Sequence, residues 1–265
     1  MAIENQIRPS SGILPRLMSS LGFLCLYLPL VCLVTYSFIQ SQPDGTQVWT
    51  LQWYQKLVTN DLILKAFYVS LWVGLCNTLV ATLIGTAAAL ALTRSQFPGR
   101  KIFNAFTYVP LIMPEIVLGL ALLIWFVLLR VTLGVYSIIL AHVTFSVSYV
   151  IITVKSRLEG LDLSLEEAAR DLGANSWMAF WKVTFPLIWP GIFSGALMAF
   201  TLSFDDFLIT YFTAGVGSDT LPLKIYSMIK YGVSPEVNAL STIMLTVTFL
   251  LVSLFFRSNR KVDLY

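Results

Sequence analysis

Six long apolar segments constrain this chain more than any other feature of its sequence. Each is long enough to cross the roughly 30 Å hydrocarbon core of a bilayer as an α-helix. Lipid offers no hydrogen-bond partner to an exposed backbone amide, so helix is the expected form. The predicted spans are residues 17–38, 66–92, 103–129, 135–154, 187–212 and 239–256. The sequence therefore predicts an all-α membrane protein with six transmembrane helices.

The composition agrees with this class and argues against others. Hydrophobic residues make up 57% of the 265 positions and charged residues only 12%, whereas a soluble domain averages about 25% charged residues. The net charge of +3 is spread over the loops and does not indicate a nucleic-acid partner. The first apolar run is too long for a cleavable signal peptide. Cys25, Cys32 and Cys76 lie in apolar runs, where we expect small core side chains rather than disulfides or metal ligands.

Basic residues indicate how the spans are oriented, because cytoplasmic loops carry an excess of Lys and Arg. Twelve of the 17 basic residues fall in one set of segments: Arg8, Arg16, Arg94, Arg100, Lys101, Lys155, Arg157, Arg170, Lys182, Arg257, Arg260 and Lys261. The opposite set holds Lys56, Lys65, Arg130, Lys224 and Lys230. The sequence therefore predicts that both termini are cytoplasmic, as an even number of spans requires.

Two outer segments are long enough to hold structure of their own. Residues 41–65 carry Trp49, Trp53 and Tyr54, which suit a helix lying at the membrane interface. Residues 215–238 contain prolines and glycines typical of a structured loop.

Residues 164–186 form a long polar passage between the fourth and fifth spans, on the predicted cytoplasmic side. Ser164 and Glu167 have the spacing of a capping box at the start of a short helix. Gly173 stands where a helix C-terminus favours a left-handed residue. The passage therefore begins with one short helix and a bend.

A second short helix follows the bend. Asn175 or Ser176 is expected to cap its start, and Pro186 is expected to end it. Such a polar hairpin between membrane spans is suited to contact with a partner in the water phase.

Three acids fall within the predicted spans: Glu115, Asp205 and Asp206. A charged residue at the bilayer centre costs about 2.5–3.5 kcal/mol on insertion scales, and no Lys or Arg lies deep in a span to pair with them. Acids beside a path would attract a cationic solute and repel an anion. Phe207 and Tyr211 offer cation–π contacts there, or packing alone.

The two neighbouring acids cannot point the same way, because adjacent residues on a helix differ by about 100°. Ser203, Asp206, Thr210 and Thr213 share one polar stripe at helical spacing. We therefore expect Asp206 to line the path and Asp205 to lie at a helix interface or to line the path less directly. The alternative is that both acids bond to neighbouring helices and only hold the bundle together.

Glu115 follows Pro110 and Pro114, and two prolines four residues apart bend a span and free backbone carbonyls. Irregular backbone at membrane depth is tolerated where it lines a cavity or is buried in protein. Glu115 is therefore either a path residue or a partly hydrated residue near a span end.

His142 is the one histidine of the chain and lies in the fourth predicted span. With no metal-ligand spacing around it, an ordinary interhelical hydrogen bond is the expected role. The sequence also has no GxxxxGK[ST] phosphate loop and no nucleophile–base constellation. We therefore predict no enzyme activity, no metal site and no ATP hydrolysis by this chain.

The polar hairpin resembles the signature loop of permease subunits in binding-protein-dependent ABC importers. That loop reads Glu-Ala-Ala, three residues, Gly, nine residues, then Ile-x-Leu-Pro. This chain has Glu167-Ala168-Ala169, three residues, Gly173, nine residues and Val183-Thr184-Phe185-Pro186. The Ile and Leu positions are replaced by Val183 and Phe185, which are conservative in volume and polarity.

The resemblance implies a type I ABC importer permease fold, with residues 1–265 as one transmembrane permease domain and residues 155–186 as its cytoplasmic coupling loop. In that family the loop is a coupling-helix pair that fits a cleft on the ATP-hydrolysing subunit. The implied contact positions are Glu167, Ala168, Ala169, Gly173 and Pro186. Glu167 has the alternative role of capping its own helix. No cofactor is expected on this chain, because ATP and Mg²⁺ would bind to the ATPase subunits.

The segments TLSFDDFLITYF and PLIMPEIVLGLALL most resemble the second permease of spermidine/putrescine importers. The resemblance implies a bacterial inner-membrane subunit for polyamines. Its partners would be a second homologous permease, two ATPase subunits and a periplasmic polyamine-binding protein. The implied path residues are Asp206, Asp205, Glu115, Tyr211 and Phe207. The alternatives are another cationic solute, an ATP-independent transporter or channel, and, less favoured, an intramembrane enzyme; preference between spermidine and putrescine stays open.

Overall fold

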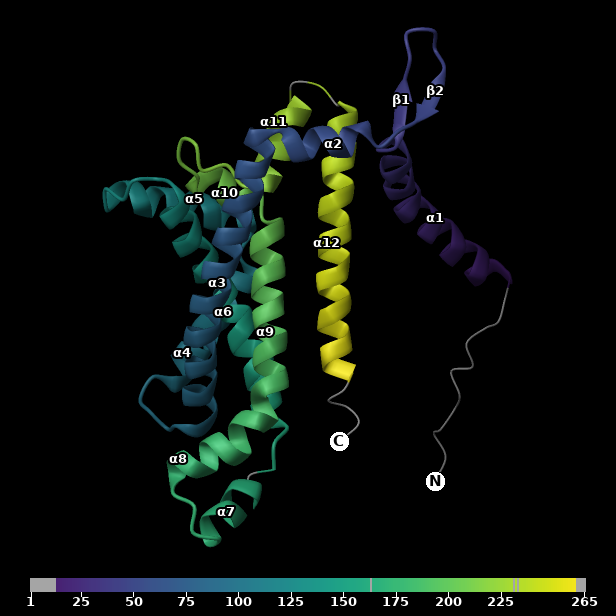
Figure 1. Cartoon of the computed structure of the whole chain (residues 1–265). Helices are drawn as coiled ribbons and strands as arrows, with labels where there is room; N and C mark the ends of the chain where they lie inside the picture. The colour runs from purple at the N-terminus through teal and green to yellow at the C-terminus, as the bar shows by residue number, and fades with distance from the viewer. Residues whose placement is uncertain (1–12, 163, 231, 233, 261–265) are drawn as a thin grey trace.

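The computed structural model describes residues 13–162, 164–230, 232 and 234–260, which are mostly helical. The helices are α1 (Ile13–Tyr36), α2 (Gln52–Thr59), α3 (Asp61–Arg94), α4 (Arg100–Ile112), α5 (Glu115–Leu128), α6 (Val135–Glu159), α7 (Ser164–Asp171), α8 (Ser176–Ala179), the π-helix η1 (Phe180–Thr184), α9 (Phe185–Asp205), α10 (Leu208–Thr213), α11 (Leu221–Lys230) and α12 (Pro235–Arg260). Helices α3, α6 and α9 pack on one another, and α12 packs on α9. Figure 1 shows α7 and α8 at one end of this bundle and α2 and α11 at the other.

Five continuous helical stretches of the described chain are long and apolar enough to cross a membrane, and four of them contain the predicted first, second, fourth and sixth spans or most of them. The third predicted span, residues 103–129, is instead a pair of helices, α4 and α5, bent by 110°. Pro114 explains the break, because the residue before a proline avoids helical geometry and Met113 is extended, with φ −69° and ψ 134°. The proline bend is confirmed, but a continuous third helix was wrong. The count reaches six only when this bent pair is taken as one span.

Small residues allow α3, α6 and α9 to approach closely. Val150 of α6 packs between Gly85 of α3 and Gly195 of α9. A Cβ atom added at Gly85 would lie 2.7 Å from the Val150 Cβ, and one at Gly195 would lie 3.3 Å from its Cγ1. Close backbone approach at glycine is typical of helix packing in membranes, where lipid supplies no hydrophobic drive between helices.

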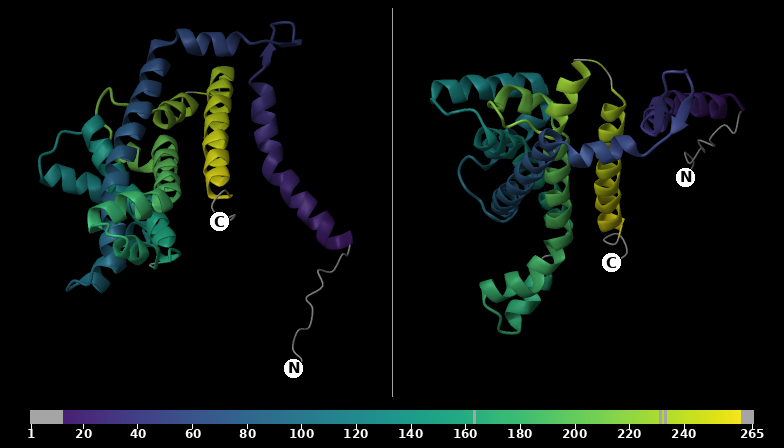
Figure 2. Two further views of the ribbon diagram at one scale, coloured as in Figure 1. Left: turned by 60° about the horizontal axis from the view of Figure 1, so that its bottom comes forward. Right: turned by 45° about the horizontal axis from the view of Figure 1, so that its top comes forward.

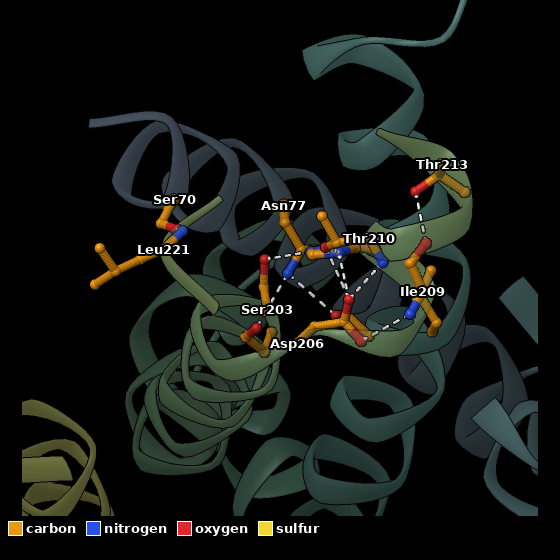
Figure 3. A network of polar contacts seen from close by, with 11 residues as sticks. Ser70, Asn77, Ser203, Asp206, Ile209, Thr210, Thr213 and Leu221 are labelled. Atoms are coloured by element: carbon orange, nitrogen blue, oxygen red, sulfur yellow. Dashed lines mark hydrogen bonds and ion pairs between the residues drawn. The ribbon is translucent and has the colours of Figure 1, made fainter. Parts of the chain in front are cut away.

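A buried amide joins the same three helices. The Asn77 Nδ2 of α3 donates to the Ser146 Oγ of α6 at 3.1 Å and to the Ala199 carbonyl of α9 at 3.0 Å. Asn77 is fully buried, and its place between these helices is visible in Figure 3. These bonds fix the rotation of each helix about its own axis, which the apolar contacts alone leave less well defined.

The segment after α1, which is predicted to lie on the outer side, holds a strand hairpin as well as the predicted helix. Strands β1 (Ile39–Ser41) and β2 (Gln47–Trp49) pair antiparallel, and α2 follows them. The Trp53 Nε1 donates to the Ile39 carbonyl at 3.0 Å, and the Tyr54 hydroxyl lies 2.7 Å from the Ser37 Oγ. These two aromatic residues thus hold α2 against the end of α1. The structured loop expected at 215–238 contains α11.

Helix α1 stands apart from the bundle over most of its length in both views of Figure 2. None of its membrane-span window is buried within the chain. Cys25 and Cys32 are therefore exposed, and Cys76 of α3 is only partly buried. The expectation of core cysteines was wrong for the first two, because α1 has its apolar faces turned away from the protein's own core.

Replacing Gly85 by Leu should destabilise the bundle, because the added side chain overlaps with Val150. Overpacking of this kind costs about 1–3 kcal/mol, so the thermal unfolding midpoint of the detergent-solubilised protein should fall. Gly22→Leu is the matched control, since no atom lies within 4 Å of a Cβ added at Gly22. Equal midpoints for the two variants would contradict the proposed packing.

Candidate functional site

Helix α9 ends inside the bundle at Asp205, and Asp206 takes an extended conformation, with φ −68° and ψ 128°. The predicted fifth span, residues 187–212, is therefore interrupted. The Asp206 carboxylate accepts hydrogen bonds from the Thr210 amide at 2.7 Å, the Thr210 hydroxyl at 2.8 Å and the Ile209 amide at 3.4 Å. An Asp that bonds the amides of the following turn competes with the helix that it ends. Asp206 here holds the first turn of α10, which begins at Leu208 after the N-cap residue Phe207.

His142 of α6 joins both sides of this break. Its Nδ1 lies 2.7 Å from the Ser203 Oγ of α9, and its Nε2 lies 3.2 Å from the Asp206 Oδ2 and 3.0 Å from the Thr210 Oγ1. His142 is fully buried, and the Asp206 side chain is only 6% exposed. The interhelical hydrogen bond predicted for His142 is confirmed. Figure 3 shows Ser203, Asp206 and Thr210 turned toward one another in this network.

Three residues of the polar stripe predicted along the fifth span do lie together, but they surround His142 in the protein interior. Ser203, Asp206 and Thr210 all meet His142, although the helix is not continuous. Asp206 therefore has a titratable partner, His142, which is neither Lys nor Arg. The signal available in the sequence was His142 itself, a titratable residue in the middle of the neighbouring span.

Asp205 is the more open of the two acids. It is exposed, whereas Asp206 is half-buried as a residue. Both line a cavity of about 320 Å³, and Asp205 also lines a second one of about 480 Å³ that faces α12. The expectation placed Asp206 on the path and Asp205 at a helix interface or lining the path less directly; both acids line the cavity, and Asp205 is the more exposed of the two.

Glu115 enters the first cavity from the other helix break. It is the first residue of α5, directly after Pro114, and is exposed. Helix α5 packs on α10, where a Cβ added at Gly119 would lie 2.8 Å from the Phe212 Cδ2. The two breaks therefore lie beside each other and bring three carboxylates to one cavity.

Aromatic rings accompany these acids. Phe207 lines the cavity together with Tyr149 of α6. The Phe207 ring centroid lies 5.7 Å from that of Tyr211 and 4.6 Å from that of Tyr226 in α11. Tyr149 was missed but lies seven residues after His142, on the same helix face; for Tyr226 the sequence offers no signal, because only the tertiary fold brings α11 here.

The chemistry of the cavity follows from its charges. Its described lining has Glu115, Asp205 and Asp206 but no Lys or Arg. Carboxylates and aromatic faces attract ammonium groups, and an anion here would meet uncompensated like charge. The site therefore suits a cationic solute.

The polar hairpin has the two short helices predicted for it. Gly173 has φ +92°, and the Gly173 and Ala174 amides donate to the Arg170 and Ala169 carbonyls, the bonding pattern of a Schellman motif. The Asn175 side chain caps α8 by accepting from the Met178 amide at 2.8 Å. Both glycine and asparagine roles are confirmed.

Two local predictions for the hairpin were wrong. Ser164 is the first residue of α7 rather than its cap, and its amide donates to the Asp162 carboxylate at 2.9 Å. Pro186 does not end a helix, because the chain runs from α8 through η1 into α9 with Pro186 in the first turn of α9. A wide π-turn, in which the Phe185 amide donates to the Phe180 carbonyl, precedes the proline that lacks an amide.

The residues implied as partner contacts differ in exposure. Glu167, Ala168, Gly173 and Pro186 are exposed, and Ala169 is half-buried. Large apolar side chains lie at the same end, with Leu172 90% exposed and Trp177 72% exposed. An apolar surface on a polar hairpin is typical of a surface that binds a partner.

Glu166, rather than its neighbour Glu167, is held by other elements. Its Oε2 accepts from the Arg94 Nη2 at 2.6 Å and from the Thr184 Oγ1 at 2.9 Å, and its Oε1 accepts from the Arg170 Nη2 at 3.0 Å. Partial burial raises the pKa of Glu166, but the Thr184 hydroxyl and the Arg94 and Arg170 guanidiniums outweigh it and lower the pKa below its ordinary value. Glu166 is therefore a carboxylate at neutral pH.

Comparison with known proteins identifies the family. The sequence profile of the binding-protein-dependent transport system inner membrane component matches residues 81–262. The chain belongs to this family. It is thus similar to multi-pass permease components of ABC transporters, and the coupling-loop resemblance is in agreement with that membership.

Two permeases of this family from Escherichia coli (strain K12) are close in sequence. The chain is 41% identical to the spermidine/putrescine transport system permease protein PotC over 228 residues, 86% of each chain. It is 42% identical to the putrescine transport system permease protein PotI over 233 residues, 85% of this chain and 83% of PotI. Both relatives are permease proteins, and this chain is likewise a permease component rather than an enzyme.

A solved structure shares the fold. A bacterial ABC transporter involved in the import of the acidic polysaccharide alginate matches with a TM-score of 0.72 and 16% identity, over 97% of this chain and 99% of that one. The likeness shows the type I importer permease fold. Because the cargo of that transporter is acidic, the fold alone does not fix the charge of the solute.

Replacing His142 by Leu should destabilise the protein, because Ser203, Asp206 and Thr210 lose a hydrogen-bond partner in a largely buried site. A buried polar group left unsatisfied costs about 1–3 kcal/mol, so the thermal unfolding midpoint should fall. Asp206→Asn should then cost much less in the His142→Leu background than in the unchanged protein. Thr144→Val in the same helix is the control, since Thr144 is exposed and bonds only its own helix at Leu140. Strictly additive effects would show that the two residues do not interact.

Proposed function

We propose that this chain is the permease subunit of an ATP-driven importer that carries polyamines across the bacterial inner membrane by alternating access. The observation that carries the proposal is the meeting of three carboxylates in one cavity whose described lining has no Lys or Arg. The sequence likeness to PotC and PotI supports spermidine, putrescine or both as the cargo. Polyamines carry several ammonium groups at neutral pH, which suits several acids spaced around one path.

The path residues divide by their surroundings. Asp205 and Glu115 are exposed at the cavity and would contact the solute first. Asp206 already accepts several internal hydrogen bonds, so it offers less charge to the solute and instead holds the break. Phe207 and Tyr211 would add cation–π contacts. Transport requires that the solute bind weakly enough to be released. Several separate contacts of this kind, one of them with an acid that already accepts internal hydrogen bonds, suit such weak binding.

We infer the assembly by analogy with other members of the family. This chain would pair with a second homologous permease, two ATPase subunits and a periplasmic polyamine-binding protein, while ATP and Mg²⁺ bind to the ATPase. Residues 1–265 act as one permease domain, with both termini and the 155–186 loop in the cytoplasm. The ATPase would bind the exposed end of the hairpin at Glu167, Ala168, Ala169, Gly173 and Pro186.

Asp205→Asn should lower polyamine uptake while leaving the complex assembled, because it removes charge from the cavity with little change of shape. Loss of about 1.4 kcal/mol of attraction corresponds to tenfold in uptake efficiency. Radiolabelled spermidine and putrescine uptake by the complete transporter is the measurement, with Asp61→Asn at the outer end of α3 as the control. Uptake unchanged in Asp205→Asn, or uptake that persists without the ATPase subunit, would contradict the proposal.

Gly173→Pro and Glu167→Lys should separate ATP hydrolysis from uptake. Proline cannot adopt the φ of +92° at position 173 and lacks the amide that donates to Arg170, while lysine reverses an exposed charge at position 167. Gly160→Ala is the control, because Gly160 has φ −85° and a Cβ added there would meet only ordinary contacts. Uptake and ATPase rates are measured on the same proteoliposomes, and normal uptake in both variants would refute the coupling assignment.

A further inference from the structure

The Glu166 carboxylate joins three elements that are far apart in sequence. Arg94 is the last residue of α3, Glu166 and Arg170 belong to α7, and Thr184 ends η1. Arg94 also donates to the Thr184 Oγ1 at 3.1 Å, which closes a triangle of Arg94, Glu166 and Thr184. We define this triangle as the Glu166 cluster.

Polar bonds rather than apolar packing attach α7 to the bundle. Among its described residues, α7 has none that is buried. The Glu166 side chain is nevertheless only 14% exposed, and Thr184 is 2% exposed. The Arg94 side chain is 29% exposed, and an ion pair that is partly shielded from water is stronger than a fully exposed one. The Glu166 cluster therefore connects α7 to α3 and η1.

The cluster lies where movement of the hairpin would enter the bundle. Thr184 belongs to the π-turn that leads into α9, and π-turns within helices are frequently found at functional sites. Helix α9 has 21 residues and ends at Asp205, at the cavity. Helix α3 packs on both α6 and α9 along its length. Movement of the hairpin at this point would therefore reach α3 and α9 together.

We propose that Glu166 is a positioning residue that transmits movement of the α7–α8 hairpin to α3 and α9 through Arg94 and Thr184. The proposal rests on the proposed function, in which an ATPase subunit grips the exposed end of the hairpin. It assigns separate tasks to adjacent acids: Glu167 faces the partner, while Glu166 faces the bundle. Removing the Glu166 carboxylate should therefore leave the ATPase bound but weaken the transmission of its movement to the spans.

The test uses the complete transporter in proteoliposomes and compares Glu166→Gln, Arg94→Gln and the double variant. Two quantities are measured: co-purification of the ATPase, and polyamine carried per ATP hydrolysed. Each single variant should retain the ATPase but carry at least about tenfold less polyamine per ATP, since a hydrogen bond between charged groups is typically worth at least the energy of a tenfold change. The double variant should be no worse than either single one.

Arg170→Gln is the matched control, because it removes an ion pair to Glu166 within α7 and leaves the bonds to α3 and η1 in place. Its transport per ATP should stay close to that of the unchanged protein. Arg94→Lys keeps the positive charge and should recover part of the loss seen in Arg94→Gln, which a general folding defect would not predict.

Several results would overturn the inference. Unchanged transport per ATP in Glu166→Gln, additive losses in the double variant, or loss of ATPase binding in either single variant would each do so. An unaltered complex that hydrolyses ATP without carrying polyamine would instead refute the proposed function and the inference together. Normal coupling in the unaltered complex with normal ratios in the variants would refute the inference alone.

Discussion

The hydrogen bonds around Asp206 allow a helix to stop inside an apolar bundle. The end of α9 and the start of α10 leave backbone groups that lipid cannot satisfy, and a buried carboxylate without donors would itself be costly. Hydrogen bonds from the Ile209 and Thr210 amides to Asp206 satisfy both the free amides and the carboxylate, and the His142 ring is a further partner of the carboxylate. Because His142 also contacts Ser203, α6 holds the chain on either side of the break. The place of Asp205 at the cavity depends on this arrangement.

Two helix breaks of different origin share the resulting cavity. Pro114 interrupts the α4–α5 pair by the steric and hydrogen-bonding limits of proline, whereas Asp206 interrupts α9 by side-chain competition for amides. Each break sets an acid at a helix terminus, beside irregular backbone, where membrane proteins line cavities. The uninterrupted α3 and α6, held closely by glycines and by Asn77, supply the frame around them.

Helix α9 connects the hairpin at one end of the molecule to the cavity. It continues from the hairpin through η1 and reaches the cavity at Asp205, over a length of about 30 Å for its 21 residues. At the hairpin end, exposed Leu172 and Trp177 provide a surface for a partner, and Glu166 binds α7 to the same helical stretch through Thr184. A permease needs such a rigid connection, because packed helices transmit displacement with little loss.

Short-range rules account for the features that could be predicted from the sequence. Apolar length predicted most of the spans, Pro114 predicted the bend, and Gly173 and Asn175 predicted the hairpin, since each depends on neighbours within about one helical turn. The stripe argument grouped Ser203, Asp206 and Thr210 correctly, but it assumed one unbroken helix, whereas α9 ends at Asp205. The pairing of His142 with Asp206, and of Glu166 with Arg94, joins residues 64 and 72 positions apart. These pairs emerge only in the folded chain, because which side chains meet depends on how the helices are rotated against one another, and no local pattern encodes that rotation.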